Sequence, residues 1–120
     1  MEGTFQAEEL KKRSKLFAIR VVRLVQALPR TDAARIIGKQ LLRSATSVAA
    51  NYRAVCRARS KAEFIAKMGV VVEEIDESVF WLELLVETNI VAQSRMGELH
   101  REATELLAIF AASQHTARGR

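Results

Sequence analysis

The sequence predicts an all-α protein, an antiparallel up-down-up-down four-helix bundle that forms a single domain over residues 1–120. Only one Pro and five Gly interrupt the chain. Apolar residues recur at helical spacing throughout, and no segment alternates polar and apolar residues as a half-buried strand would. Short connections between four helical segments make sequential helices antiparallel neighbours.

The first helix is predicted over residues 8–28. One face of this segment is apolar over an arc of roughly 100°. Pro29 ends the helix, because a residue that precedes Pro is disfavoured in helical geometry. The apolar arc consists of Leu10, Phe17, Val21, Leu24, Val25 and Leu28.

The second and third helices are predicted over residues 32–57 and 60–88. Thr31 or Asp32 caps the second helix. Ser60 followed by Glu63 forms a capping box for the third, which stops near Asn89. The core arc of the third helix consists of Phe64, Met68, Val71, Ile75, Val79, Leu82 and Val86.

The fourth helix is predicted over residues 94–113, with Ser94 as its cap. Residues 114–120 are expected to fray, as chain ends commonly do. The core stripe consists of Met96, Leu99, Ala103, Leu106, Leu107 and Phe110.

Composition restricts the class of protein. With 49% hydrophobic residues and a net charge of +5, the chain is too apolar for a disordered protein. A single Cys excludes an intramolecular disulfide and fits a reducing compartment. There is no signal-peptide core and no apolar run near the ~20 residues of a membrane span, so we expect a cytoplasmic protein.

The charge is divided between the two halves of the chain. Residues 1–60 hold 13 basic and 4 acidic side chains, a balance of +9, whereas residues 61–120 hold 6 and 10, a balance of −4. Such a chain can pair with itself or with an anionic partner.

The second helix has three separable faces. Its core arc consists of Ile37, Leu41, Ala45, Val48, Ala49, Tyr52, Val55 and Cys56. A polar seam follows at spacings of 4, 3 and 4: Gln40, Ser44, Ser47 and Asn51. This polar seam is either a partly exposed flank or a surface packed against another helix, with small Ser side chains allowing close approach and the amides hydrogen-bonding across it.

The third face of this helix is basic. No acidic residue occurs between Ala33 and Ala62, so ion pairs between successive turns are missing there. Unneutralised cations in a row suit phosphate contacts with RNA or DNA, although a solvated helix face is the alternative. The candidate nucleic-acid-binding residues are Arg35, Lys39, Arg43, Arg53, Arg57 and Arg59, and cations of the first helix could extend them: Lys11, Lys12, Arg13, Lys15, Arg20 and Arg23.

The third helix carries a second apolar stripe that includes the chain's one Trp. One bundle face cannot bury both stripes, and carboxylates border the second, which predicts a subunit interface. The candidates are Glu73, Glu77, Phe80, Trp81 and Leu84, together with the polar seam of the second helix.

Signals for catalysis are weak. A di-metal carboxylate bundle needs Glu-x-x-His pairs, and the sequence has none. Cys56 falls on the apolar arc with no His near it in sequence, which favours a small core residue over a nucleophile. No Gly-rich phosphate loop is present. We expect a non-enzyme without a metal or cofactor.

The stretch from Gln40 to Asn51 (QLLRSATSVAAN) resembles a signature of the four-helix-bundle proteins encoded in intervening sequences of bacterial 23S ribosomal RNA genes. The family motif is approximately Q-L-R-R-A-x-x-S-I-x-x-N-I-A-E-G, and Gln40, Arg43, Ser47 and Asn51 stand in register with it, with Ala45 one position after the motif's Ala. Residues 59–64 (RSKAEF) are similar to the family's R-x-S-x-x-E-F. The motif's E-G is replaced by Ala54 and Val55, so a role of that Glu is absent here.

The resemblance implies a homo-oligomer, with a pentamer known in this fold, and an association with nucleic acid. The accessory proteins of diversity-generating retroelements look like the same fold, and they act beside a reverse transcriptase; nothing in the sequence places this chain specifically with them. The first hypothesis is therefore a homo-oligomer that binds RNA or DNA phosphates. The second is a protein–protein adaptor or oligomeric scaffold in which the basic face pairs with Glu73, Glu77 and Glu83 of a neighbouring subunit.

Overall fold

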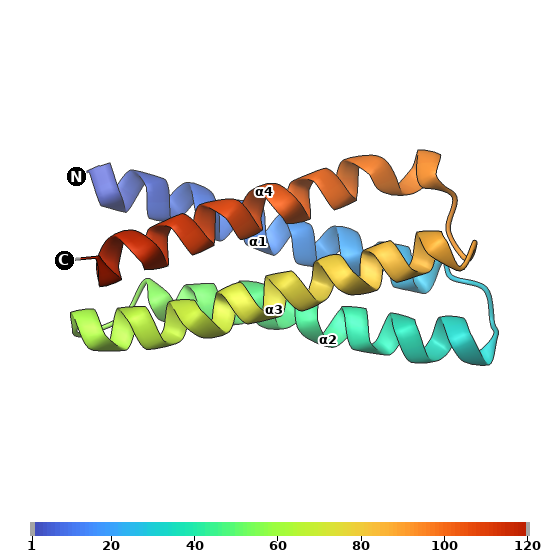
Figure 1. Cartoon of the computed structure of the whole chain (residues 1–120), viewed down its shortest axis with the longest axis horizontal. Coiled ribbons are helices and arrows are strands. Elements are labelled where there is room, and N and C mark those ends of the chain that lie inside the picture. Colours follow the sequence, from blue (N-terminus) through green and yellow to red (C-terminus); the bar gives the residue numbers. More distant parts are fainter. Residues whose placement is uncertain (1, 120) are drawn as a thin grey trace.

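A computed structural model describes the backbone of residues 2–119 and the side chains of residues 5–119. Four helices run antiparallel along a rod of 46 × 21 × 21 Å: α1 (Glu2–Gln26), α2 (Asp32–Val55), α3 (Lys61–Glu87) and α4 (Gln93–Arg118) (Figure 1). Each helix packs closely on the next, whereas α1 and α4 touch more sparsely and α1 and α3 lie on opposite corners. This confirms the predicted all-α up-down-up-down bundle.

Both predicted caps of the middle helices are present. The Ala34 N–H donates to Thr31 Oγ1 at 3.1 Å, and the Glu63 N–H donates to Ser60 Oγ at 3.0 Å. The Glu63 carboxylate accepts from the Arg59 N–H at 2.6 Å instead of from the Ser60 N–H, so the capping box reaches one residue further back than predicted.

The last carbonyl groups of α3 accept hydrogen bonds from the residues that directly follow the helix. Asn89 adopts a left-handed backbone with φ of 62°, a conformation that Asn tolerates better than most residues. The Asn89 N–H donates to Val86 O at 2.9 Å, and the Ile90 N–H donates to Leu85 O at 2.9 Å. These two bonds form a Schellman motif, which explains the predicted stop at Asn89.

The predictions for α4 need two corrections. The helix begins at Gln93 after the N-cap residue Ala92, which makes no side-chain cap, so Ser94 is not the cap. Residues 114–118 are helical, not frayed, and Gln114 Nε2 anchors this end of α4 by donating to Ile65 O of α3 at 3.2 Å. A contact between residues 49 positions apart is invisible to local sequence patterns.

The core contains most of the predicted apolar positions. Phe17, Leu41, Ile75 and Phe110 are fully buried. On α3, Leu85 and not Val86 is the fully buried residue at the last turn.

Cys56 is exposed, which contradicts its predicted core position. It is the C-cap residue of α2, and its side chain lines an open hollow at this end of the bundle instead of entering the core. In the part of the chain that the structure describes, no helix is long and apolar enough to cross a membrane.

Candidate nucleic-acid and subunit interfaces

A groove between α1 and α2 gathers four cations. Lys11, Lys12 and Lys15 come from α1 and Arg53 from α2. Small side chains form the floor and leave a cavity of about 480 Å³: Thr46, Ala49 and Ala50. Lys11 also bonds to Glu8 at 2.9 Å, but within residues 5–119 no ion pair joins Lys12, Lys15 or Arg53 to a carboxylate.

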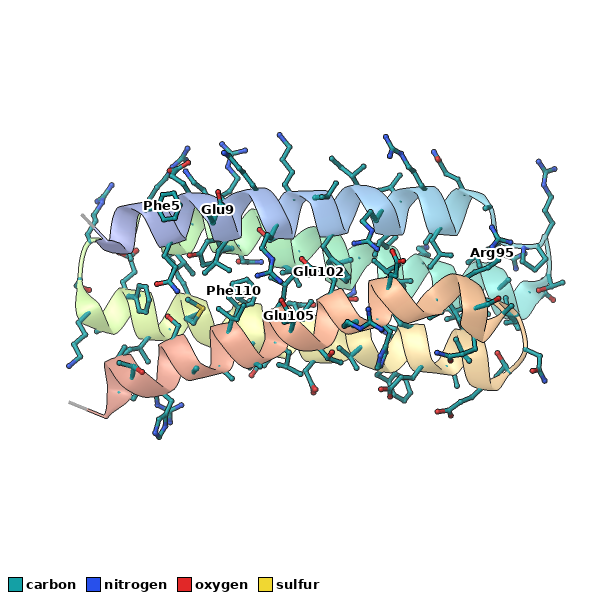
Figure 2. The ribbon with its side chains drawn as sticks, turned by 90° about the horizontal axis from the view of Figure 1, so that it is seen from above. Phe5, Glu9, Arg95, Glu102, Glu105 and Phe110 are labelled. Atoms are coloured by element: carbon teal, nitrogen blue, oxygen red, sulfur yellow. The ribbon has the colours of Figure 1, made fainter. Side chains whose placement is uncertain are left out.

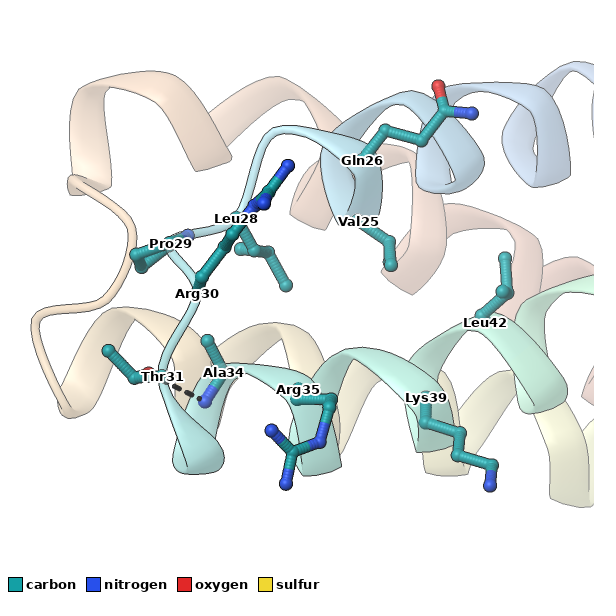
Figure 3. Close-up of a pocket in the computed structure, with 10 residues that line it drawn as sticks. All are labelled: Val25, Gln26, Leu28, Pro29, Arg30, Thr31, Ala34, Arg35, Lys39 and Leu42. Atoms are coloured by element: carbon teal, nitrogen blue, oxygen red, sulfur yellow. Dashed lines mark hydrogen bonds between the residues drawn. The ribbon is translucent and has the colours of Figure 1, made fainter.

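Further hollows extend this groove toward both ends of the α1–α2 side. At the α1–α2 turn, Arg30, Arg35 and Lys39 surround a partly apolar hollow (Figure 3). Gly38 packs closely under this turn, where a Cβ would lie 2.9 Å from Leu28 Cδ1 and would displace the end of that side chain. At the opposite end, a third hollow shares Lys11 and Arg53 with the groove and adds the exposed Arg57.

We call this surface the basic track: Lys11, Lys12, Lys15, Arg30, Arg35, Lys39, Arg53 and Arg57. It includes four of the six predicted nucleic-acid-binding residues of helix 2 and the following loop. Arg35 additionally pairs with Asp32 at 3.1 Å, and both side chains are largely exposed. The sequence predicted that this face has no ion pair between successive turns, and for Arg35 that prediction is wrong. Arg59 is exposed near the start of α3 and does not line these hollows.

Arg43 departs from this group. Its Nη1 donates to Glu74 Oε1 at 3.2 Å, and its Nη2 pairs with Glu77, so the guanidinium bridges two α3 carboxylates of the same chain. Trp81 Nε1 donates to the same Glu77 carboxylate at 2.9 Å. The hydrogen bond from Arg43, followed by that from Trp81, lowers the pKa of Glu77 below its ordinary 4.5.

The polar seam is divided between two roles. Ser44 is fully buried, and its Oγ hydrogen-bonds Ser78 Oγ of α3 at 2.9 Å. This contact agrees with the packed alternative, in which small residues allow close helix approach. Asn51 instead bonds within α2, with its Nδ2 donating to Ser47 O at 2.9 Å and to Ser47 Oγ at 2.8 Å. Gln40 is half-buried.

The second stripe of α3 is only partly covered by the bundle, because Trp81 and Leu84 pack against the core while Phe80 does not. Phe80 is 52% exposed and packs edge-on against Trp81 with ring centroids 4.8 Å apart. Trp81 and Leu84 are half-buried, and Glu73 is exposed. Phe80 is therefore the member of this stripe that the described chain leaves mostly uncovered.

The described residues hold no cluster of three or more His, Cys, Asp or Glu side chains that could bind a metal ion. His100 Nε2 lies 2.8 Å from Glu83 Oε2 on the surface between α3 and α4. Partial burial raises the pKa of the Cys56 thiol, which disfavours the reactive thiolate.

Comparison with known proteins identifies the family. Residues 7–112 match the family model described as 23S rRNA-intervening sequence protein. The chain belongs to this family. A crystal structure of a protein with unknown function from the S23 ribosomal protein family of Bacteroides thetaiotaomicron VPI-5482 superposes with a TM-score of 0.83. The two chains are 31% identical over 90% of this chain and 96% of that one, and no curated protein matches.

The family motif and the basic track occupy different sides of α2. Arg43 bridges two carboxylates of α3, and Ser44 bonds Ser78 of the same helix. By helical spacing, Gln40, Ser47 and Asn51 share one arc of α2 with Ser44. The motif recognised in the sequence therefore marks the α2–α3 contact and not the groove.

Sequence reasoning missed two features of the surface. Leu16 and Ile19 are exposed on the outer face of α1 by 53% and 37%, and their position outside the core arc of that helix was a usable signal. Arg13 forms ion pairs across the α1–α4 contact with Glu102 and Glu105 at 2.8 and 2.7 Å. Figure 2 shows these two carboxylates of α4 on its side toward α1. A separation of about ninety residues left no signal for this bridge.

Proposed function

We propose that this chain is a non-catalytic, self-associating four-helix bundle that binds RNA or DNA through phosphate groups along the basic track. The observation that carries the proposal is the groove in which Lys12, Lys15 and Arg53 surround a floor of small residues. Lys and Arg side chains that neutralise phosphates release the counterions condensed on the nucleic acid. This release provides affinity that is independent of nucleotide sequence.

The lining of the groove also favours contact with the backbone over contact with bases. Its side chains are Lys, Arg, Thr and Ala, so none offers an aromatic face for base stacking. The resemblance to pentameric bundles makes a ring of five subunits the expected assembly, and the exposed aromatic stripe of α3 supports self-association.

A charge-reversal experiment tests the proposal. Lys15→Glu/Arg53→Glu should abolish binding of a labelled RNA or DNA measured by fluorescence anisotropy. The matched control is Arg95→Glu/Arg101→Glu, which makes the same change in net charge on exposed positions of α4. Equal affinities of the two double variants would contradict the role of the groove. Arg43 is unsuitable for this test, because its reversal would also disrupt the pairs with Glu74 and Glu77.

The exposed Phe80 favours a second candidate, a protein–protein adaptor without nucleic-acid contact. The same titration separates the two candidates. If the wild-type chain binds neither RNA nor DNA even at low salt, where phosphate contacts are strongest, the adaptor is the better account.

A further inference from the structure

Two outer helix faces have matching patterns of charge and apolar residues. On α1, Lys12, Leu16, Ile19 and Arg23 follow one another at spacings of 4, 3 and 4, which places them on one face. All four are exposed. We call this the α1 outer face: two apolar residues with a cation at each end.

The corresponding surface of α3 has the opposite charge. Glu77, Phe80, Leu84 and Glu87 follow at spacings of 3, 4 and 3, with two apolar residues between carboxylates. Glu77 also bonds to Arg43, and the exposed Glu73 adds a carboxylate one turn further along the same face. We call this the α3 outer face.

The two faces also match in length. At about 1.5 Å per residue, the α1 outer face extends roughly 16 Å between its end residues and the α3 outer face roughly 15 Å. Two aliphatic side chains can therefore lie against Phe80 and Leu84 while each cation of α1 lies near a carboxylate of α3. Salt bridges at the edge of such a contact mainly select the partner and its orientation, and the apolar centre provides most of the affinity.

The positions of α1 and α3 in the bundle determine how many neighbours one copy can hold. Because α1 and α3 occupy opposite corners, their outer faces point away from each other. One copy can thus hold a neighbour at each face, and such a heterologous contact generates a ring when its rotation closes.

We infer that the α1 outer face of one copy docks on the α3 outer face of a second copy in a head-to-tail arrangement. Both surfaces belong to the same polypeptide, carry opposite charge and leave large apolar residues exposed. This inference rests on the self-association part of the proposed function and names the surfaces that meet. Because Lys12 belongs to both the groove and the α1 outer face, the phosphate contacts of an assembled copy fall to Lys15 and Arg53. The pairing itself does not depend on nucleic-acid binding.

A mixing experiment distinguishes this arrangement from a symmetric one. Leu16→Glu and Phe80→Glu each place a carboxylate in one apolar centre, and because both side chains are more than half exposed, the fold should be retained. Each variant alone should be monomeric by light scattering. Mixed in equal amounts, they should form a 1:1 dimer, because one variant retains an intact α3 outer face and the other an intact α1 outer face.

Controls make each result interpretable. Ala108→Glu adds the same carboxylate at an exposed position of α4 and should assemble as the wild type does. Circular dichroism spectra should show the same helix content for all the variants, whereas assembled variants should melt at a higher temperature than monomeric ones. Assembly of either single variant as in the wild type, or a mixture that stays monomeric, would overturn the pairing alone. A monomeric wild type would overturn both the pairing and the self-association, and the nucleic-acid titration would remain an independent test.

Discussion

Cations occupy two kinds of environment in this bundle. Arg13 and Arg43 each bridge two carboxylates, across the α1–α4 and α2–α3 contacts respectively. Lys12, Lys15 and Arg53 line a groove without a carboxylate partner among the described side chains. The two groups are indistinguishable by composition. The difference shows that the neighbours of a cation determine whether it stabilises the fold or stays available for an anion.

Among the cations of the bundle, the largest effect of a substitution on stability is expected at Arg13. Its guanidinium bonds to Glu102 and Glu105, and these side chains are 31%, 21% and 57% exposed. Arg13→Ala removes the bridge and leaves the two carboxylates without their cation. We expect a loss of about 1–2 kcal/mol in the free energy of unfolding, since charge-assisted bonds are worth more than this and partial exposure screens them.

The matched control for this prediction is Lys15→Ala, at an exposed position half a turn further along the same helix. It should change the free energy of unfolding by no more than about 0.5 kcal/mol. Urea denaturation of both variants supplies the comparison. A similar loss in the two variants would contradict the division into paired and available cations.

A smaller loss of stability is expected at Arg43. Half of its side chain is exposed, so solvent screens its pairs with Glu74 and Glu77 more strongly than those of Arg13. Arg43→Gln should therefore lower the melting temperature by less than Arg13→Ala does. The reverse order in thermal unfolding would show that the α2–α3 ion pairs matter more to stability than their exposure indicates.

The smallest effect concerns pH. Because the pKa of Glu77 is lowered below 4.5, the folded state favours its ionised form. The stability that this group contributes is present above pH 4.5 and is lost as the pH falls through the lowered pKa. Trp81 bonds to the same carboxylate and is the one Trp in the sequence, so its fluorescence reports the protonation.

The emission change of the wild type should have its midpoint below pH 4.5. In Arg43→Gln the midpoint should move to higher pH, because the largest cause of the pKa shift is removed. An unchanged midpoint in this variant would mean that Arg43 does not control Glu77.

Much of the fold was predictable because its signals are local. Thr31 and Ser60 cap the helices that follow them, and Asn89 permits the left-handed turn after α3. The helical state of residues 114–118 was missed, and the contact that anchors this end of α4 joins Gln114 to Ile65 of α3. Local periodicity carries no information about such distant contacts.

The candidate sites were predictable only in part. The basic face of the second helix was recognised, but the sequence did not show that Arg43 is paired within the chain while Arg53 lines a groove. That distinction depends on the register between α2 and α3, which places residues 31 and 34 positions apart in contact. On the outer face of α1, the sequence indicated the cations Lys12 and Arg23, but the exposed Leu16 and Ile19 between them were missed.

The salt dependence of nucleic-acid affinity tests the central claim most directly. Each cation that contacts a phosphate adds about one unit to the slope of log affinity against log salt concentration. Lys15→Gln/Arg53→Gln should therefore reduce the slope by about two units while leaving the melting temperature unchanged. A slope equal to that of the wild type would contradict the account, since it would place the phosphate contacts away from the α1–α2 groove.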